Sequence, residues 1–172
     1  KIAEHEKVLV LDFGGQYSKL IARRVREWNV YSEVVPYDIS IATIKELKPA
    51  GIIFSGGPAS VASDNAPYVD EEIFKLEVPI LGICYGMQLM SHLLPGGQVE
   101  QAKEREYGRA NLTVKEPLGL LDGLGSELEC WMSHGDRVIE IPTGFEIIGY
   151  TDNSPVAAVG NKYLGFYGVQ FH

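Results

Sequence analysis

The stretch that decides the fold runs Pro79-Ile80-Leu81-Gly82-Ile83-Cys84-Tyr85-Gly86-Met87-Gln88. It contains an apolar strand, the motif Gly-x-Cys-x-Gly and the start of a helix. This is the thiol version of the strand-turn-helix elbow that holds a nucleophile on a strained turn. Glycines on either side of Cys84 let the backbone turn sharply. We therefore predict that Cys84 is a nucleophile rather than a structural cysteine, and that free N–H groups at the helix N-terminus favour its thiolate.

The chain around this elbow alternates short apolar runs with helical patterns. We expect strands at 8–11, 31–35, 51–54 and 78–83, and helices at 17–28, 41–47, 68–76 and 85–94. Strands that are apolar throughout are typical of sheets covered on both faces. Repeated β-α units of this length imply a doubly wound sheet. The predicted fold class is α/β, with a mostly parallel sheet and helices on both faces.

The second half of the chain changes character. Short extended runs, punctuated by Gly, Pro, Asn and Asp, occur at 110–114, 127–132, 145–151, 155–159 and 163–171. They predict additional, mostly antiparallel strands, some of which extend the edge of the main sheet. The polar stretch from Ser133 to Arg137 is expected to be a loop. Because no internal repeat or low-complexity linker occurs, residues 1–172 are expected to form one domain.

Composition excludes several classes of function. The formal net charge is −8, from 23 acidic against 15 basic residues, whereas a nucleic-acid surface needs clustered basic charge. No apolar run approaches the roughly 20 residues that a membrane span requires. The polar residues 1–6 run straight into a strand and do not resemble a signal peptide. We therefore expect a cytoplasmic protein with neither nucleic-acid nor membrane partners.

The two cysteines, Cys84 and Cys130, form neither a disulfide framework nor a CxxC metal site. Cys130 lies in an apolar context without glycines around it, which predicts a core position. The P-loop motif Gly-Lys-Ser/Thr is absent as well, so no nucleoside triphosphate site is expected. Neither a metal nor another cofactor is predicted for this chain.

A second glycine motif, Ser55-Gly56-Gly57-Pro58, follows the expected strand 51–54. It would lie at the carboxyl edge of the sheet, where open α/β sheets bind ligands. Attack of a thiolate on an amide creates an oxyanion that needs fixed hydrogen-bond donors. We predict the backbone N–H groups of Gly57 and Tyr85 as these donors. The competing interpretation of the motif is an ordinary turn from strand to loop.

The candidates for a general base are His5, His92, His134 and His172. His5 lies in the polar leader, and His92 lies two helical turns beyond Cys84. His172 ends an apolar strand, which is the rigid support that a base requires. Spacing alone does not choose between His134 and His172.

The helix expected at 85–94 is apolar except for a strip formed by Gln88, Ser91 and His92. Residues spaced in this way share one face of a helix. Gln88 lies one turn beyond Cys84. Its amide therefore either reaches a substrate in the same pocket or is exposed to solvent.

Three motifs resemble the class I glutamine amidotransferases. In chain order they are Ser55-Gly56-Gly57-Pro58, the Cys84 elbow and Gly168-Val169-Gln170-Phe171-His172. The resemblance covers nearly the whole chain. It implies that Cys84 is the nucleophile and His172 the base of a glutaminase. It also implies that further residues help to hold glutamine, namely Gln88, Ser133, Gly135 and Asp136.

Four more stretches resemble the amidotransferase part of the GMP synthetases: Asp12-Phe13-Gly14-Gly15-Gln16-Tyr17, Arg105-Glu106-Tyr107-Gly108-Arg109-Ala110, Trp131-Met132-Ser133-His134-Gly135-Asp136 and Thr151-Asp152-Asn153-Ser154-Pro155. This resemblance implies that the ammonia passes to an ATP-pyrophosphatase synthetase domain or subunit. That partner would use ATP and Mg²⁺ to aminate XMP to GMP. No residue of this chain is expected to perform that second step.

One departure from the family pattern concerns the closing motif His-Pro-Glu, whose Glu orients the histidine. The sequence stops at His172, so the domain is expected to be truncated just after its base. Two alternatives remain open. The chain could serve another pathway, of the anthranilate or carbamoyl phosphate type, or it could be a non-catalytic regulatory module.

Overall fold

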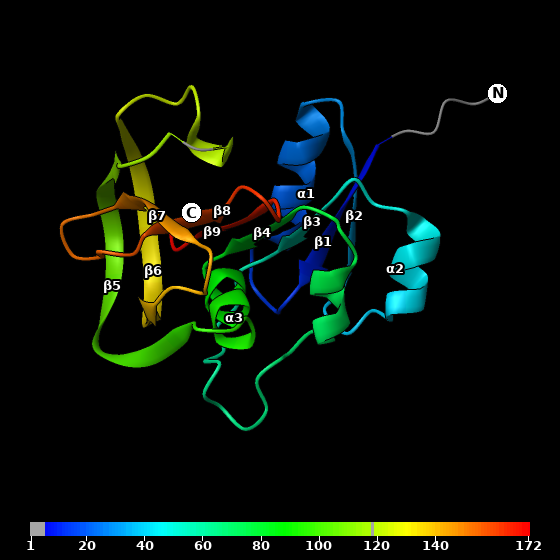
Figure 1. Ribbon diagram of the computed structural model, residues 1–172, viewed down its shortest axis with the longest axis horizontal. Coiled ribbons are helices and arrows are strands. Elements are labelled where there is room, and N and C mark those ends of the chain that lie inside the picture. The colour runs from blue at the N-terminus through cyan, green and yellow to red at the C-terminus, as the bar shows by residue number, and fades with distance from the viewer. Residues whose placement is uncertain (1–5, 118) are drawn as a thin grey trace.

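The computed structural model describes residues 6–117 and 119–172. Within these ranges, one nine-stranded sheet has the order β2-β1-β3-β4-β9-β8-β7-β5-β6 (Figure 1). The strands are β1 (Lys7–Asp12), β2 (Tyr31–Pro36), β3 (Gly51–Phe54), β4 (Ile80–Ile83), β5 (Gln98–Val114), β6 (Glu127–Glu140), β7 (Glu146–Tyr150), β8 (Ala158–Asn161) and β9 (Phe166–Val169). The helices are α1 (Ser18–Glu27), α2 (Ile41–Leu47) and α3 (Tyr85–Leu93), with short 3-10 turns η1 (Glu71–Lys75) and η2 (Gly119–Leu121).

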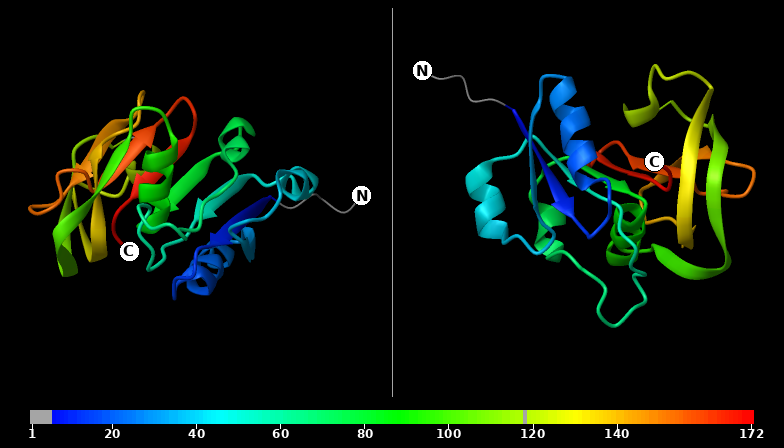
Figure 2. Two further views of the ribbon diagram at one scale, coloured as in Figure 1. Left: turned by 90° about the horizontal axis from the view of Figure 1, so that it is seen from below. Right: turned by 180° about the vertical axis from the view of Figure 1, so that it is seen from behind.

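The first four strands and β9 are parallel to their neighbours in this group. Leu9, Val10 and Leu11 are fully buried in β1, as an apolar strand covered on both faces requires. Helix α1 lies on one face of the sheet, and α2 and α3 lie on the other (Figure 2). The predicted doubly wound α/β fold is therefore confirmed.

The remaining strands run antiparallel and continue the same sheet beyond β9. The predicted antiparallel strands are thus confirmed, but the expected loop from Ser133 to Arg137 is wrong, because these residues lie within β6. Burial alternates along this strand, with Met132, His134, Asp136 and Val138 buried. The alternation of apolar and polar residues expected of a strand is not visible in the sequence here, because two of the buried positions hold the polar residues His134 and Asp136. Their side chains face a polar pocket rather than the core.

The helix expected at 68–76 is also wrong, because only the five-residue turn η1 forms there. Asp70 caps this turn by accepting a hydrogen bond from the Glu72 backbone N–H at 3.0 Å. After Leu76 the chain turns through Glu77, whose φ is +59°. It then becomes extended before Pro79, because a proline disfavours helical backbone in the preceding residue.

Two apolar clusters hold the sheet together. The larger one joins the inner residues of β1, β3 and β4 to α2 and α3, and it includes Leu11, Phe54 and Met87. The smaller one lies under the antiparallel strands and includes Leu112, Met132 and Ile148. Cys130 belongs to the smaller cluster and is 7% exposed, as predicted for a core cysteine. The site described below lies where the parallel and antiparallel halves of the sheet meet.

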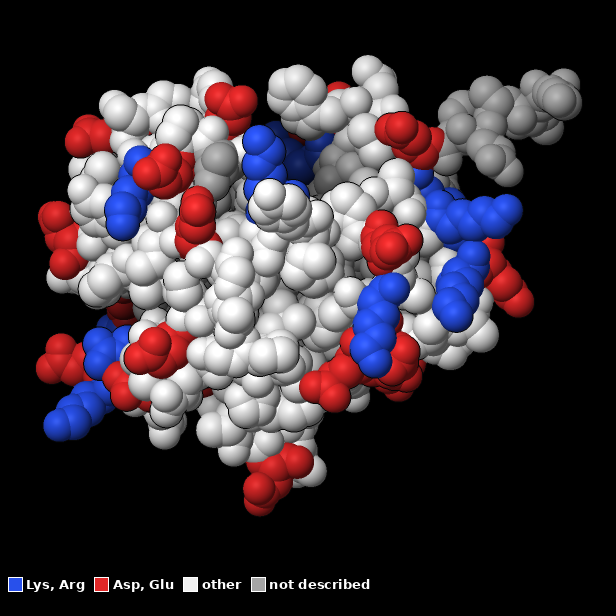
Figure 3. Space-filling model, viewed as in Figure 1, with Lys and Arg blue, Asp and Glu red and all other residues white. Residues whose placement is uncertain are grey.

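The surface carries mixed charge. On the face shown in Figure 3, basic side chains lie in several separate groups among acidic ones. Among the described residues, no helix has the length and apolar character needed to cross a membrane.

Candidate active site

Cys84 occupies a sharp turn between β4 and α3, with φ +54° and ψ −108°. A non-glycine residue at positive φ is strained, and such strain concentrates at functional sites. Its backbone N–H donates to the Val169 carbonyl at 2.7 Å, which fixes the turn to β9. The flanking glycines permit a close approach, because a Cβ on Gly86 would lie 2.4 Å from the Phe54 carbonyl oxygen. A Cβ on Gly82 would lie 2.6 Å from the Gly86 backbone.

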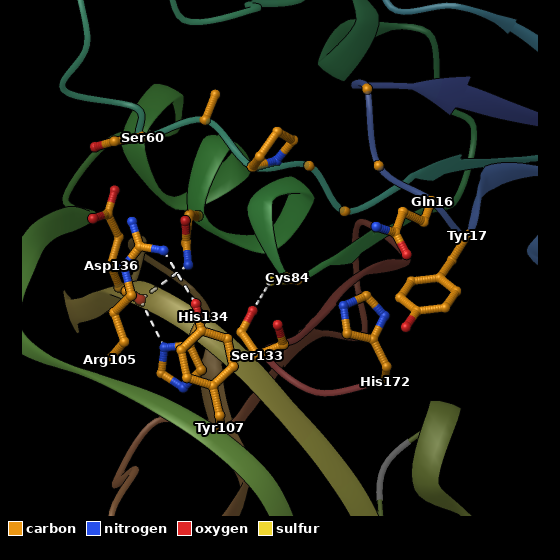
Figure 4. Close-up of a pocket in the computed structure, with 18 of the residues that line it drawn as sticks. Gln16, Tyr17, Ser60, Cys84, Arg105, Tyr107, Ser133, His134, Asp136 and His172 are labelled. Carbon is orange, nitrogen blue, oxygen red and sulfur yellow. Dashed lines mark hydrogen bonds between the residues drawn. The ribbon is translucent and has the colours of Figure 1, made fainter.

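A pocket of about 390 Å³ opens above Cys84 at the carboxyl ends of β1, β3 and β4 (Figure 4). In the figure, Arg105, His134 and Asp136 lie on one side of Cys84, and Tyr17 and His172 lie on the other. The pocket brings together all the predicted site residues except Tyr85 among its lining: Gly57, Cys84, Gln88, Ser133, Gly135, Asp136 and His172. Tyr85 contributes its backbone N–H, which points to the Cys84 sulfur.

The Cys84 thiol donates to the Ser133 carbonyl at 3.5 Å and accepts a hydrogen bond from Gln170 Nε2 at 3.6 Å. Burial raises its pKa to about 11, against the lowering effect of the Tyr85 N–H and Gln170. The predicted thiolate is therefore wrong, because a pKa of about 11 keeps the sulfur protonated at neutral pH. Desolvation of a side chain that is 5% exposed outweighs the donors at the helix N-terminus. Attack by this sulfur would require transfer of its proton to a base.

His172 and Cys84 both lie beside Gly56, on the side to which a side chain at that position would point. A Cβ placed on Gly56 would lie 3.1 Å from His172 Cε1 and 3.5 Å from Cys84 Cβ. The His172 backbone exchanges two hydrogen bonds with Trp131 of β6, at 2.8 and 2.9 Å. Its ring lies against that of Tyr17, with 5.1 Å between the centroids. Burial lowers the pKa of His172, so its imidazole is neutral and ready to accept a proton at neutral pH.

The other histidines are engaged elsewhere. His134 Nδ1 lies 2.9 Å from the Asp136 carbonyl oxygen and Nε2 lies 3.0 Å from a Glu106 oxygen, so both ring nitrogens have partners. His92 is exposed and lies 3.0 Å from the Tyr68 hydroxyl. His5 falls outside the described residues. Both His134 and His172 line the pocket, but of these two rings only that of His134 is held by hydrogen bonds to described residues.

Gln88 is 3% exposed, so the alternative of a solvent-exposed amide is wrong. Its Nε2 atom donates to the Asp136 carbonyl at 3.0 Å and to Gln170 Oε1 at 3.2 Å. Ser91, on the same strip of α3, is fully buried. Two of the three residues of the strip thus face the inside of the protein, where α3 contacts β4, β9 and the antiparallel strands β5 and β6, whereas His92 is exposed.

Two opposite charges line the pocket on the side away from His172. Arg105 lies over Gly135, where a Cβ would be 3.3 Å from the guanidinium Nε. The Tyr107 hydroxyl, which accepts a 3.1 Å hydrogen bond from Arg105, and the Asp136 carboxylate raise the pKa of Arg105. This end of the pocket thus offers one cationic and one anionic partner to a zwitterion.

Metal-binding side chains are not gathered in this part of the chain. Within residues 6–117 and 119–172, His, Cys, Asp and Glu do not form a group of three that would hold a metal ion.

Comparison with known sequences decides the family. The profile described as Glutamine amidotransferase class-I matches residues 9–172. The chain belongs to this family.

Relatives of this amidotransferase include glutamine-hydrolyzing GMP synthases. The enzyme of Halothermothrix orenii is 62% identical over 98% of this chain and 33% of the relative. That of Lactobacillus acidophilus is 56% identical over 99% of this chain and 33% of the relative. The amidotransferase chain thus spans about a third of the length of the curated relatives that it matches.

Solved structures agree with the family assignment. A protein from Thermoplasma acidophilum, described as a candidate GMP synthase subunit, has a TM-score of 0.83 and 31% identity. The match covers 98% of the amidotransferase chain and 84% of that protein. A glutamine amidotransferase from Thermotoga maritima has a TM-score of 0.73 at 19% identity, which shows a shared fold.

Three contacts in the amidotransferase pocket are not predicted from sequence: Tyr17 against His172, Arg105 beside Asp136, and Gln170 on the Cys84 sulfur. Each lies inside a stretch that carries the family resemblance. Gln170 has a local signal, because it is a polar residue in an apolar strand and is 1% exposed. Tyr17 and Arg105 are exposed and have no comparable signal.

The raised pKa of Cys84 predicts a distinctive pH profile for the amidotransferase without glutamine. Only the thiolate attacks iodoacetamide, and with a pKa of about 11 roughly one thiol in 10⁴ is ionised at pH 7. We expect the alkylation rate at Cys84 to rise tenfold for each pH unit up to about 11. Peptide mass spectrometry would measure it, with Cys84→Ala as the control for Cys130. A midpoint below pH 8 would contradict the effect of burial.

Proposed function

We propose that this chain hydrolyses glutamine to glutamate and ammonia and supplies the ammonia to a synthetase that makes GMP from XMP. The observation that carries the proposal is the strained Cys84 elbow in a pocket that Gly57 and His172 also line, with the Tyr85 N–H directed at the Cys84 sulfur. A structural cysteine has no need of positive φ, flanking glycines and a neighbouring imidazole.

In the proposed reaction, His172 takes the proton of the Cys84 thiol as the sulfur attacks the side-chain amide carbon of glutamine. The oxyanion that forms is stabilised by the N–H groups of Gly57 and Tyr85. His172 then returns the proton to the departing nitrogen, which leaves as ammonia. The resulting glutamyl thioester is hydrolysed by a water that His172 deprotonates, which frees glutamate and restores the thiol. One water is consumed for each glutamine.

Glutamine is proposed to bind through both ends. Its α-ammonium group suits the Asp136 carboxylate, and its α-carboxylate suits the Arg105 guanidinium. Gln88, Ser133 and Gly135 line the space between these charges and Cys84. Since the Asp136 charge is one of the causes that raise the Cys84 pKa, a bound ammonium would oppose that effect and favour ionisation of the thiol.

Delivery to GMP synthesis is supported by the relatives, which are glutamine-hydrolyzing GMP synthases about three times as long as this chain. The proposed partner is an ATP-pyrophosphatase synthetase domain or subunit, which would use ATP and Mg²⁺. The four stretches that resemble the GMP synthetases favour this acceptor over the anthranilate or carbamoyl phosphate type. Addition of XMP and ATP to the complete protein with glutamine should therefore yield GMP.

A glutamine analogue that carries a diazoketone tests the proposed nucleophile. We expect it to alkylate Cys84 at neutral pH and to spare Cys130, because only Cys84 shares a pocket with His172. Excess glutamine should protect Cys84. The labelled peptides would be mapped by mass spectrometry, with His172→Ala as the variant that slows labelling. Equal labelling of both thiols, or a lack of protection by glutamine, would remove the support for this site.

A further inference from the structure

Three of the four stretches that resemble the GMP synthetases meet in a polar cluster formed by Glu106, His134 and Ser154. A Glu106 carboxylate oxygen lies 3.0 Å from His134 Nε2 and accepts a hydrogen bond from the Ser154 hydroxyl at 2.7 Å. His134 and Ser154 are each 8% exposed. Glu106 does not line the glutamine pocket but faces a neighbouring cavity of about 730 Å³. The proposed reaction gives this carboxylate no role.

The cluster fixes the orientation of His134. A carbonyl oxygen can only accept a hydrogen bond, so Nδ1 carries the proton that it shares with the Asp136 carbonyl at 2.9 Å. The other nitrogen, Nε2, pairs with Glu106, and a further proton shared between these two atoms makes that contact a hydrogen bond. The carboxylate therefore holds the imidazole in the orientation in which Nδ1 donates to the Asp136 carbonyl. The dashed line from His134 marks this hydrogen bond (Figure 4).

From Asp136 the hydrogen bonds continue to the nucleophile. The same carbonyl oxygen accepts from Gln88 Nε2 at 3.0 Å. Gln88 Nε2 also donates to Gln170 Oε1 at 3.2 Å, and Gln170 Nε2 donates to the Cys84 sulfur at 3.6 Å. A continuous chain of hydrogen bonds thus joins Glu106 to Cys84 through the wall of the pocket.

The sheet itself gives this part of the pocket little support. Strand β5 pairs regularly with β6 at Gln101 with Asp136, and again at Glu106 with His134. Four residues of β5, at 102–105, therefore lie opposite the single residue Gly135. Such a bulge leaves residues without ladder hydrogen bonds. Glu106 is the first residue after the bulge, and its side chain supplies the support that the ladder does not.

We propose that Glu106 is a positioning residue for glutamine. It acts through His134 and the Asp136 carbonyl to hold Gln88 and the pocket edge from Ser133 to Asp136 in the geometry that receives the substrate. Ser154 orients Glu106. The role rests on the proposed glutaminase function, since it concerns the affinity of that same pocket.

Steady-state glutamine hydrolysis by the complete protein tests this role. We expect Glu106→Ala to raise KM for glutamine about tenfold, because the residues that bind glutamine lose their positions. Its kcat should stay within about threefold of the wild-type value, because the Cys84 elbow is unchanged. Glu106→Gln should return KM to within about threefold of the wild type, since its amide can bond both His134 Nε2 and the Ser154 hydroxyl. Glu129→Ala, which removes an exposed carboxylate from β6, is the matched control and should leave KM unchanged.

Further measurements separate the possible outcomes. Iodoacetamide should alkylate Cys84 at the wild-type rate in Glu106→Ala, which would show that the elbow is intact. If that variant fails to fold, Ser154→Ala should still raise KM about threefold. An unchanged KM in a folded Glu106→Ala variant, or a fall in kcat alone, would overturn the positioning role. A wild-type protein without Cys84-dependent hydrolysis would instead overturn the proposed function.

Discussion

Replacing Cys84 by alanine is expected to reduce glutamine hydrolysis by at least roughly 10⁴-fold, because removal of a covalent nucleophile leaves only the binding groups and the oxyanion donors. Glutamate release measured with the complete protein would report the loss. Glutamine should still bind, since the contacts proposed for Arg105, Asp136 and Gln88 remain. We therefore expect a glutamine Kd within a few-fold of the wild-type value, measured by calorimetry.

Two further measurements define what the loss means. Cys130→Ala should retain hydrolysis, because Cys130 belongs to the apolar cluster under the antiparallel strands. Free ammonia should still support GMP formation when the Cys84→Ala protein is assayed with the proposed synthetase domain or subunit, because the proposed synthetase step does not use the thiol. If Cys84→Ala hydrolysed glutamine at the wild-type rate, the chemistry proposed for this pocket would be wrong. The regulatory module considered from sequence would then become the better explanation of the fold.

Replacing Gly86 by alanine is expected to destabilise the protein by about 3 kcal/mol and to abolish hydrolysis. The new methyl group would lie 2.4 Å from the Phe54 carbonyl oxygen and 2.6 Å from Phe54 Cβ, and Phe54 is fully buried. A displacement of β3 or α3 that relieves this clash would also move Cys84. For a domain of this size, the loss corresponds to a fall in Tm of roughly 6–12 °C, which differential scanning calorimetry would measure.

Gly51→Ala provides a matched control on β3. Its added Cβ would meet nothing closer than 3.8 Å, and Gly51 is not among the residues with positive φ. We expect a change within about 1 kcal/mol and normal hydrolysis. If Gly86→Ala had the same Tm as the wild type, the prediction would be wrong. The packing of β3 against α3 would then be looser than the 2.4 Å between the added Cβ and the Phe54 carbonyl oxygen indicates.

The elbow and the parallel half of the sheet could be predicted from sequence because their signals are local. Glycine spacing around Cys84 and apolar runs such as Val8 to Leu11 fall within a few residues. The pocket edge in β6 could not be recognised, since His134 and Asp136 occupy buried positions where a strand pattern expects apolar residues. Its identity as a strand depends on pairing with β5, which no local pattern encodes.

The polar contacts around Cys84 join distant parts of the chain and were therefore hidden. Gln170 is 86 positions from Cys84, and Ser154 is 48 positions from Glu106. The burial of the Cys84 thiol could not be predicted from sequence for the same reason. The sequence places Cys84 at a helix N-terminus, where its thiolate is favoured, but the pKa of about 11 arises from atoms that only the folded sheet brings around the sulfur.

The position of β9 has a consequence for biosynthesis. Of the nine strands described, this one is made after the other eight, yet it inserts at the middle of the sheet, between β4 and β8. On the ribosome, β4 presents an open edge until residues 166–169 have emerged, and Val169 is not yet there to receive the Cys84 N–H. A nascent chain therefore carries the thiol long before it can assemble the pocket. The hydrolysis proposed at Cys84 would therefore have to await insertion of β9. The exposed edge of β4 is the point at which a chaperone would protect the unfinished sheet.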